Sequence, residues 1–201
     1  LFYYQAVEGK LNGVTGLFPL MAPDARFADI GATVETALTA ADDQPVYLIK
    51  AMPGLDVRFD LAPAVPPLVA VRQRADLQPG FAVKQSYGPL TLLGYRAGRN
   101  GDTLTVALYW RVDQPAAQNY TTTVQLFNAA GEKVAQHDEM PGGRYYPTTL
   151  WKAGEVLVET HTLALAQDAM PTTLLVGMYD STTLTPLASP LKLSFSYVIP
   201  I

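Results

Sequence analysis

Apolar and polar residues alternate with a period of two through the second part of this 201-residue sequence. The clearest example is "TLTVALYWRV" (103–112), and the stretches "NYTTTVQLF" (119–127) and "LKLSFSYVI" (191–199) repeat the pattern. Successive side chains of a β-strand point to opposite faces, so each stretch predicts a strand with one apolar and one polar face. Such strands are typical of antiparallel sheets that bury one side and expose the other.

Turn residues separate these stretches from several shorter ones. Motifs such as "GRNGD", "NAAGEK" and "KAGE" mark the turns. Further strands are expected at 83–87, 90–96, 132–138, 155–165 and 172–180. Short strands at this spacing predict an antiparallel β-sandwich over residues 80–201, either Ig-like or jelly-roll. Alternation alone does not reveal the strand order, so both alternatives stay open.

Residues 1–75 have a different texture and predict a small α/β unit. A helix is expected after Asp24, a candidate N-cap, because apolar residues then recur at spacings of three and four. These residues are Phe27, Ile30, Val34, Leu38 and Ala41. Strands are expected at 46–51 and 66–73, whereas "LDVRFDL" (55–61) suits either a strand or a short helix. The segment "RADLQPG" (74–80) is interpreted as the connector. The expected fold is therefore mainly β, with a small α/β unit ahead of a sandwich.

Composition excludes several classes of function. The chain is 49% hydrophobic and 16% charged, which predicts a globular core rather than disorder. Its net charge is −4 and its charges are interspersed, so nothing favours binding to nucleic acid. There is no cysteine, which rules out disulfides and thiolate chemistry. A Gly-rich phosphate loop is also missing from the first part, so no nucleotide fold is indicated.

No catalytic motif stands out, and the sequence predicts no catalytic residue, no metal and no cofactor. The only imidazole-plus-carboxylate candidates are "HDE" (137–139) and His161, which we interpret as parts of a solvated hairpin. A metal site would need His137, Asp138 or Glu139, and His161 to converge from two strands, without a spacing motif to support it. The carboxylate pairs Asp56 with Asp60 and Glu155 with Glu159 are interpreted as solubility charges.

The segment "GGRYYPTTLWKAGE" (142–155) is the one candidate binding site. Aromatic side chains stack on sugar rings, and loops on a rigid sandwich are common binding sites. Arg144, Tyr145, Tyr146 and Trp151 are therefore the predicted ligand-binding residues. The alternative is a loop that folds back and plugs one end of the core, with Trp151 buried. Trp110, in phase with its apolar neighbours, is predicted to lie in the core.

Residues 90–187 resemble a known family in the order and content of several blocks. The blocks "YP-T-x-LW-x-x-GE" and "VGMYD" are the most distinctive, and "PVYLIKAMPGLDVRFDLAP" (45–63) precedes them. Together they are similar to the extracytoplasmic C-terminal domain of multispanning bacterial glycosyltransferases, of the protein O-mannosyltransferase and aminoarabinose transferase class found in Chloroflexi-type genomes. The resembling strands are "LLGYRAGRNGDTLTVALYWRV", "NYTTTVQLFNAAGEKVAQHDEMP", "YPTTLWKAGEVLVETHTLAL" and "LLVGMYDSTTLTPL".

The resemblance implies a parent protein that transfers a sugar from a polyprenyl-phosphate donor. Its catalytic acids belong to membrane loops with no counterpart here, so no catalytic residue is carried over to this sequence. The expected function is a non-catalytic accessory domain on the outer side of a membrane, tethered by a membrane region outside this sequence. Its expected partners are that transmembrane part and a glycan, acceptor or polyprenyl-linked sugar. The alternative is a free-standing carbohydrate-binding or adhesion module of a secreted protein.

Overall fold

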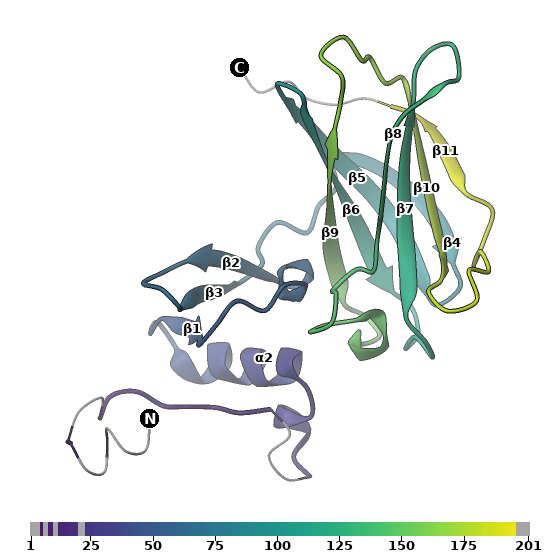
Figure 1. Ribbon diagram of the computed structural model, residues 1–201. Helices are drawn as coiled ribbons and strands as arrows, with labels where there is room; N and C mark the ends of the chain where they lie inside the picture. Colours follow the sequence, from purple (N-terminus) through teal and green to yellow (C-terminus); the bar gives the residue numbers. More distant parts are fainter. Residues whose placement is uncertain (1–4, 6–7, 10–11, 20–22, 196–201) are drawn as a thin grey trace. The chain divides into compact units, whose positions relative to one another are not determined.

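A computed structural model describes the chain except for residues 1–4, 6–7, 10–11, 20–22 and 196–201 (Figure 1). The chain separates into two compact units, Leu1–Val46 and Tyr47–Ile201, and each is described by itself. Among the described residues, no helix combines the length and the apolar character that crossing a bilayer requires.

The first unit contains the short 3-10 helix η1 (Ala25–Phe27) and the helix α2 (Ile30–Ala41). The helix was expected to begin at Asp24, but Asp24 caps η1 and a second aspartate caps α2. The Asp29 side chain accepts a hydrogen bond from the Ala32 amide at 2.8 Å, which satisfies one of the free N–H groups of the first turn. Sequence periodicity did not show this break, because η1 and α2 share the same spacing of apolar residues.

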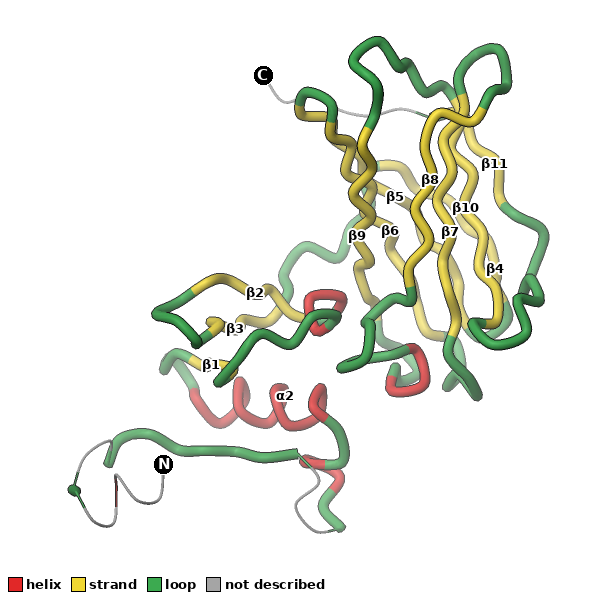
Figure 2. The backbone as a smooth tube through the Cα atoms, in the orientation of Figure 1, coloured by secondary structure: helices red, strands yellow, loops and turns green. Residues whose placement is uncertain are grey.

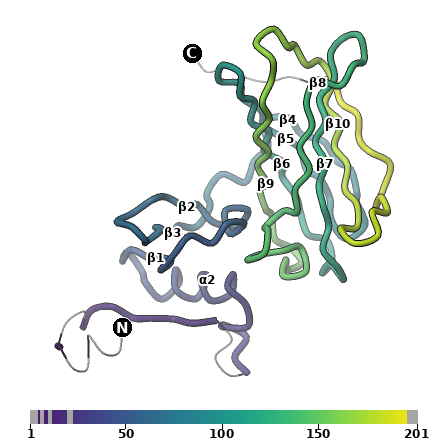
Figure 3. Tube along the Cα trace, in the orientation of Figure 1, coloured from purple at the N-terminus to yellow at the C-terminus, as the bar shows by residue number. Residues whose placement is uncertain are grey.

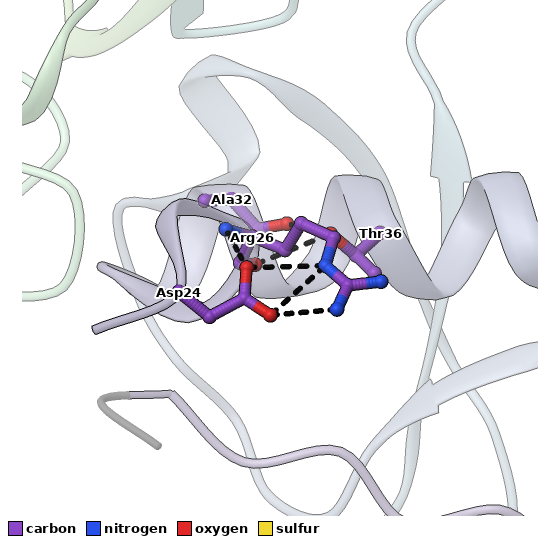
Figure 4. A network of polar contacts seen from close by, with 4 residues as sticks. All are labelled: Asp24, Arg26, Ala32 and Thr36. Atoms are coloured by element: carbon purple, nitrogen blue, oxygen red, sulfur yellow. Dashed lines mark hydrogen bonds and ion pairs between the residues drawn. The ribbon is translucent and has the colours of Figure 1, made fainter. Parts of the chain in front are cut away.

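A local ion pair lies at the start of η1 (Figure 4). The Arg26 guanidinium donates to the Asp24 carboxylate at 2.6 Å, and the Arg26 amide donates to the same side chain at 3.0 Å. The Arg26 side chain is 69% exposed, so this pair contributes little to the stability of the fold.

The second unit begins with a small three-stranded sheet in the order β1-β3-β2. Its strands are β1 (Val46–Leu48), β2 (Phe59–Pro63) and β3 (Val69–Gln73), and the last two pair antiparallel. The stretch 55–61, for which a strand and a short helix were both expected, contains one of each. Its first part is the 3-10 helix η2 (Leu55–Val57), and Phe59 starts β2. Gly54, with a φ of 99°, permits the tight entry into η2.

The rest of the second unit consists of two four-stranded antiparallel sheets, as the sequence predicts (Figure 2). One sheet has the order β4-β5-β6-β9 and the other β11-β10-β7-β8. The strands are β4 (Phe81–Tyr87), β5 (Leu90–Asn100), β6 (Thr103–Val112), β7 (Tyr120–Phe127), β8 (Lys133–Glu139), β9 (Val156–Ala164), β10 (Thr173–Asp180) and β11 (Leu191–Ser194). Strand β11 is shorter than the predicted 191–199, of which residues 196–199 lie outside the described residues. The fold is mainly β, and the predicted fold class is confirmed.

The apolar faces predicted from the alternation form the core between the sheets. On β6, the five apolar residues Leu104, Val106, Leu108, Trp110 and Val112 are all buried. Trp110 meets the Tyr87 ring edge-on at 5.5 Å, a favoured arrangement of two aromatic rings. The Tyr87 hydroxyl donates to the Val176 carbonyl at 2.7 Å, so a side chain of β4 is bonded to the backbone of the opposite sheet. The prediction of Trp110 as a core residue is confirmed.

A partly buried charge network connects Arg58, the residue before β2, to the sandwich. The Arg58 guanidinium lies 2.9 Å from the Glu155 carboxylate, and these side chains are only 10% and 16% exposed. Arg58 also donates to the Tyr146 hydroxyl at 2.9 Å, and that hydroxyl donates to Glu155 at 3.2 Å. The interpretation of Glu155 as a solubility charge is therefore wrong.

Breaking the Arg58–Glu155 pair is expected to destabilise the second unit. Glu155→Gln should lower the free energy of unfolding by about 3 kcal/mol, because it removes a negative charge 2.9 Å from a poorly solvated guanidinium. The control Arg111→Met removes an exposed pair with Asp113, whose two side chains are 42% and 33% exposed, and should lower it by less than about 1 kcal/mol. Urea unfolding measures both values, and equal losses would contradict a special role for the buried pair.

Candidate functional site

The segment 142–155 folds back onto the end of the sandwich. Trp151 is 2% exposed, and its indole N–H donates to the Tyr146 carbonyl at 2.9 Å. Tyr146 itself is fully buried. The Thr148 hydroxyl accepts from the Tyr120 amide at 3.1 Å, which fastens the segment to the start of β7. Neither Trp151 nor Tyr146 therefore offers a ring face to a ligand, and both lie as a plug would place them.

Arg144 and Tyr145 are the two predicted site residues that face outward. Arg144 is exposed, and its guanidinium carbon lies 5.1 Å from the centre of the half-buried Tyr145 ring. The Lys50 ammonium approaches the same ring to 5.9 Å. The structure thus splits the four predicted ligand-binding residues into a buried pair and an accessible pair. The accessible pair combines an aromatic ring with two cations.

Gly142 makes this plug possible because no side chain fits there. Its φ is 77°, and a Cβ would lie 1.8 Å from the Tyr146 carbonyl oxygen. Gly154 has a similar φ of 89° but open space around it. A substitution at Gly154 therefore adds only backbone strain, whereas a substitution at Gly142 adds the same strain and a steric clash.

Gly142→Ala is expected to lower the free energy of unfolding by about 4 kcal/mol, since backbone must move to admit the methyl group. Gly154→Ala should cost only about 1–2 kcal/mol, the strain of a left-handed conformation. Denaturant unfolding of the two variants gives the comparison. A Gly142→Ala loss no larger than that of Gly154→Ala would show that the segment rearranges freely.

Acrylamide quenching tests the burial of Trp151 directly. In a Trp110→Phe variant that keeps its far-UV spectrum, the remaining Trp151 fluorescence should be shielded from acrylamide, because the ring is 2% exposed. A quenching constant near that of free tryptophan would instead restore Trp151 as a surface for ligands.

A second cluster lies where the edge strands of the two sheets meet. Strand β8 ends one sheet and β9 ends the other, and the two contact each other (Figure 3). His137 and Glu139 lie two residues apart on β8, and the register of β8 places them opposite the buried residues Val124 and Thr122 of β7. His161 of β9 points into the same space, with its Nδ1 atom 2.9 Å from Nδ1 of His137.

Glu159 holds the other side of the His161 ring. These two residues of β9 are 2% and 0% exposed. His161 Nε2 lies 3.0 Å from a carboxylate oxygen of Glu159, an ion-pair distance at which the ring N–H is not aligned for a hydrogen bond. The other carboxylate oxygen accepts from the Trp110 indole N–H at 3.0 Å. The carboxylate is therefore anchored by Trp110 and faces the imidazole.

Two opposing effects set the pKa of His161. Burial lowers this pKa, but the nearby carboxylate of Glu159 raises it, with smaller contributions from Glu139 and Asp138. The balance leaves the pKa of His161 above its ordinary value.

The sequence interpretation of this cluster is wrong in two respects. His161 is not part of a solvated hairpin, because it is fully buried, and Glu159 is not a solubility charge. The one available signal was the phase of β9, where Glu159 and His161 alternate with Thr160 and Thr162 and share the face of Leu157.

Asp180, at the end of β10, behaves as a turn residue, since it accepts hydrogen bonds from the amides of Thr182 and Thr183 at 2.7 and 2.8 Å.

The convergence that a metal site would require is present. His137, Glu139 and His161 each offer one ligand atom, and these atoms lie within 4.8 Å of one another. Two strands of different sheets supply them, which is why spacing along the sequence gives no motif. Among the described residues this is the group of histidines and carboxylates that could hold a metal ion.

Comparison with known proteins adds a distant likeness in structure. No protein-family model and no curated protein matches the sequence. Among solved structures, the chain is similar to "Crystal structure of the C-terminal domain of wzt", with a TM-score of 0.39 and 12% identity over 60% of this chain and 83% of that one. The likeness is to a β-rich domain, and it assigns no family to this chain.

Proposed function

We propose that this chain is a non-catalytic, extracytoplasmic accessory domain of a membrane glycosyltransferase-like protein. It would be tethered by membrane spans encoded outside this sequence and would contact a glycan, an acceptor or a polyprenyl-linked sugar. The observation that carries the proposal is the junction of Arg58, Tyr146 and Glu155. These residues come from the two segments on which the family resemblance rests.

The contacts of Arg58 with Tyr146 and Glu155 suggest a structural role for the distinctive sequence block 146–155. In "YP-T-x-LW-x-x-GE", Tyr146 and Glu155 bind Arg58, Trp151 fastens to the Tyr146 carbonyl, and Gly154 takes the positive φ of the turn. The residues that resemble the family thus serve one task, which is to connect the segment before β2 to the sandwich. A domain built in this way can transmit a fixed orientation from a membrane region to the sandwich.

In the segment 142–155, called the turn segment from here on, the accessible residues Arg144 and Tyr145 suit contact with a sugar. The Tyr145 ring offers an apolar contact to a sugar, and Arg144 and Lys50, which approach the ring within 6 Å, can turn their donors toward hydroxyl or phosphate oxygens. The buried Tyr146 and Trp151 would then support this surface rather than form it.

The complete reading frame tests the membrane tether. We expect several apolar stretches of at least about 18 residues ahead of this chain, and cleavage of the chain by protease added outside intact cells. A secretory signal followed by no membrane span would replace the proposal with the alternative of a free-standing carbohydrate-binding or adhesion module.

Sugar contact is tested separately by NMR titration of the chain with mannose-containing oligosaccharides and a short polyprenyl phosphate sugar. Shifts are expected at Arg144 and Tyr145, and Tyr145→Ala should weaken binding about tenfold, as the loss of one stacking ring predicts. Tyr47→Ala removes an exposed tyrosine (46%) outside the turn segment and should change nothing. Shifts that map elsewhere, or equal effects of both variants, would contradict this surface.

A further inference from the structure

We propose that His137, Glu139 and His161 bind a divalent transition metal ion of the zinc class at the edge where β8 meets β9. The inference is independent of the proposed function. It rests on three features of the cluster: the approach of the two Nδ1 atoms, the buried carboxylate behind His161, and the open side toward solvent.

The two Nδ1 atoms already stand near the separation that one metal ion imposes on two ligands. They lie 2.9 Å apart, whereas zinc–nitrogen bonds of about 2.0–2.1 Å in tetrahedral geometry separate two nitrogens by about 3.3 Å. Two protonated Nδ1 atoms would repel each other at this distance. The space between the rings therefore holds either one shared proton or a metal ion beside both lone pairs.

Glu159 fixes the form of His161 that a metal ion needs. Its carboxylate lies 3.0 Å from Nε2, and this negative charge favours the neutral tautomer with the proton on Nε2, which leaves the Nδ1 lone pair toward His137. A carboxylate behind a ligating histidine is the usual partner in zinc sites, where it orients the ring and strengthens its basicity. Trp110 in turn holds the carboxylate by its indole N–H. Glu159 is thus a positioning residue rather than a ligand.

Glu139 supplies the third ligand and the route from solvent. Its carboxylate lies 4.0 Å from His137 Nδ1, and the side chains of Glu139 and His137 are 52% and 37% exposed. An ion can therefore reach the buried Nδ1 of His161 from the surface of the sandwich edge. Two imidazoles and one carboxylate favour zinc and its neighbours over calcium or magnesium, which prefer oxygen ligands.

Metal binding would connect the two sheets at a place where no backbone ladder does. The strands β8 and β9 belong to different sheets, and each is the last strand of its own sheet. Ligands from both strands would hold this edge closed. The expected consequence is a chain that resists thermal unfolding better with zinc than after treatment with a chelator.

Zinc affinity at pH 7.5, measured by competition with a chromophoric chelator, tests the site. We expect one ion per chain, no comparable binding of magnesium or calcium, and a loss of at least about tenfold in His137→Ala and in Glu139→Ala. Both positions are partly exposed, so these variants should fold. The matched control is Asp138→Asn, because Asp138 lies between them in the sequence of β8 with its side chain on the opposite face, and this change should leave the affinity within about twofold.

A spectroscopic readout distinguishes the built site from chance binding at the surface. On adding zinc, the ¹⁵N signals of Nδ1 in both His137 and His161 should move, while Nε2 of His161 should stay protonated. Glu159→Gln should weaken zinc binding by about 10–100-fold without abolishing it. Affinities equal to that of Asp138→Asn in both ligand variants, or a shift confined to His137, would overturn the proposal.

Discussion

The position of Trp110 between the two sheets is the interaction on which the sandwich depends. One edge of its ring meets Tyr87, whose hydroxyl bonds to the backbone of the opposite sheet. Its indole N–H holds Glu159, which faces His161, and His161 reaches His137 on β8. A single chain of contacts, buried except at His137, therefore runs from β4 at one edge to the β8–β9 edge at the other. The core and the candidate metal site are two parts of this same arrangement.

Glu159 and His161 are buried on the edge strand β9, and ionisable side chains at such a place affect how the edge can pair. Edge strands present unpaired backbone groups, and inward-pointing charged side chains are one of the means by which proteins prevent pairing with another chain. Glu159 and His161 place such groups on β9, where burial demands that each find a partner. Trp110 donates to one carboxylate oxygen of Glu159, and the other oxygen lies at an ion-pair distance of 3.0 Å from His161 Nε2. His161 therefore belongs both to this inward-pointing polar pair and to the proposed metal site.

The turn segment, residues 142–155, closes one end of the sandwich and connects it to Arg58, the residue before β2. Trp151 and Tyr146 fill the end, while Arg58 and Glu155 bring opposite charges together in a poorly solvated place. The close approach of Gly142 to the Tyr146 carbonyl shows how tightly this part is packed. Of the four predicted ligand-binding residues, Tyr146 and Trp151 belong to this packing, whereas Arg144 is exposed and Tyr145 half-buried.

The sequence by itself determined the strands and their inward faces. Alternation is local, so the burial of Leu104, Val106 and Leu108 follows from one strand without knowledge of its neighbours. Only the tertiary structure decided the break of the first helix at Asp29, the burial of Trp151 and the convergence of His137 with His161. The convergence of His137 with His161 depends on which strands become edges, and it joins residues that are far apart along the chain. The cap of α2 and the hydrogen bond of Trp151 to Tyr146 are local, but they depend on which polar group a side chain finds, and no periodicity records that.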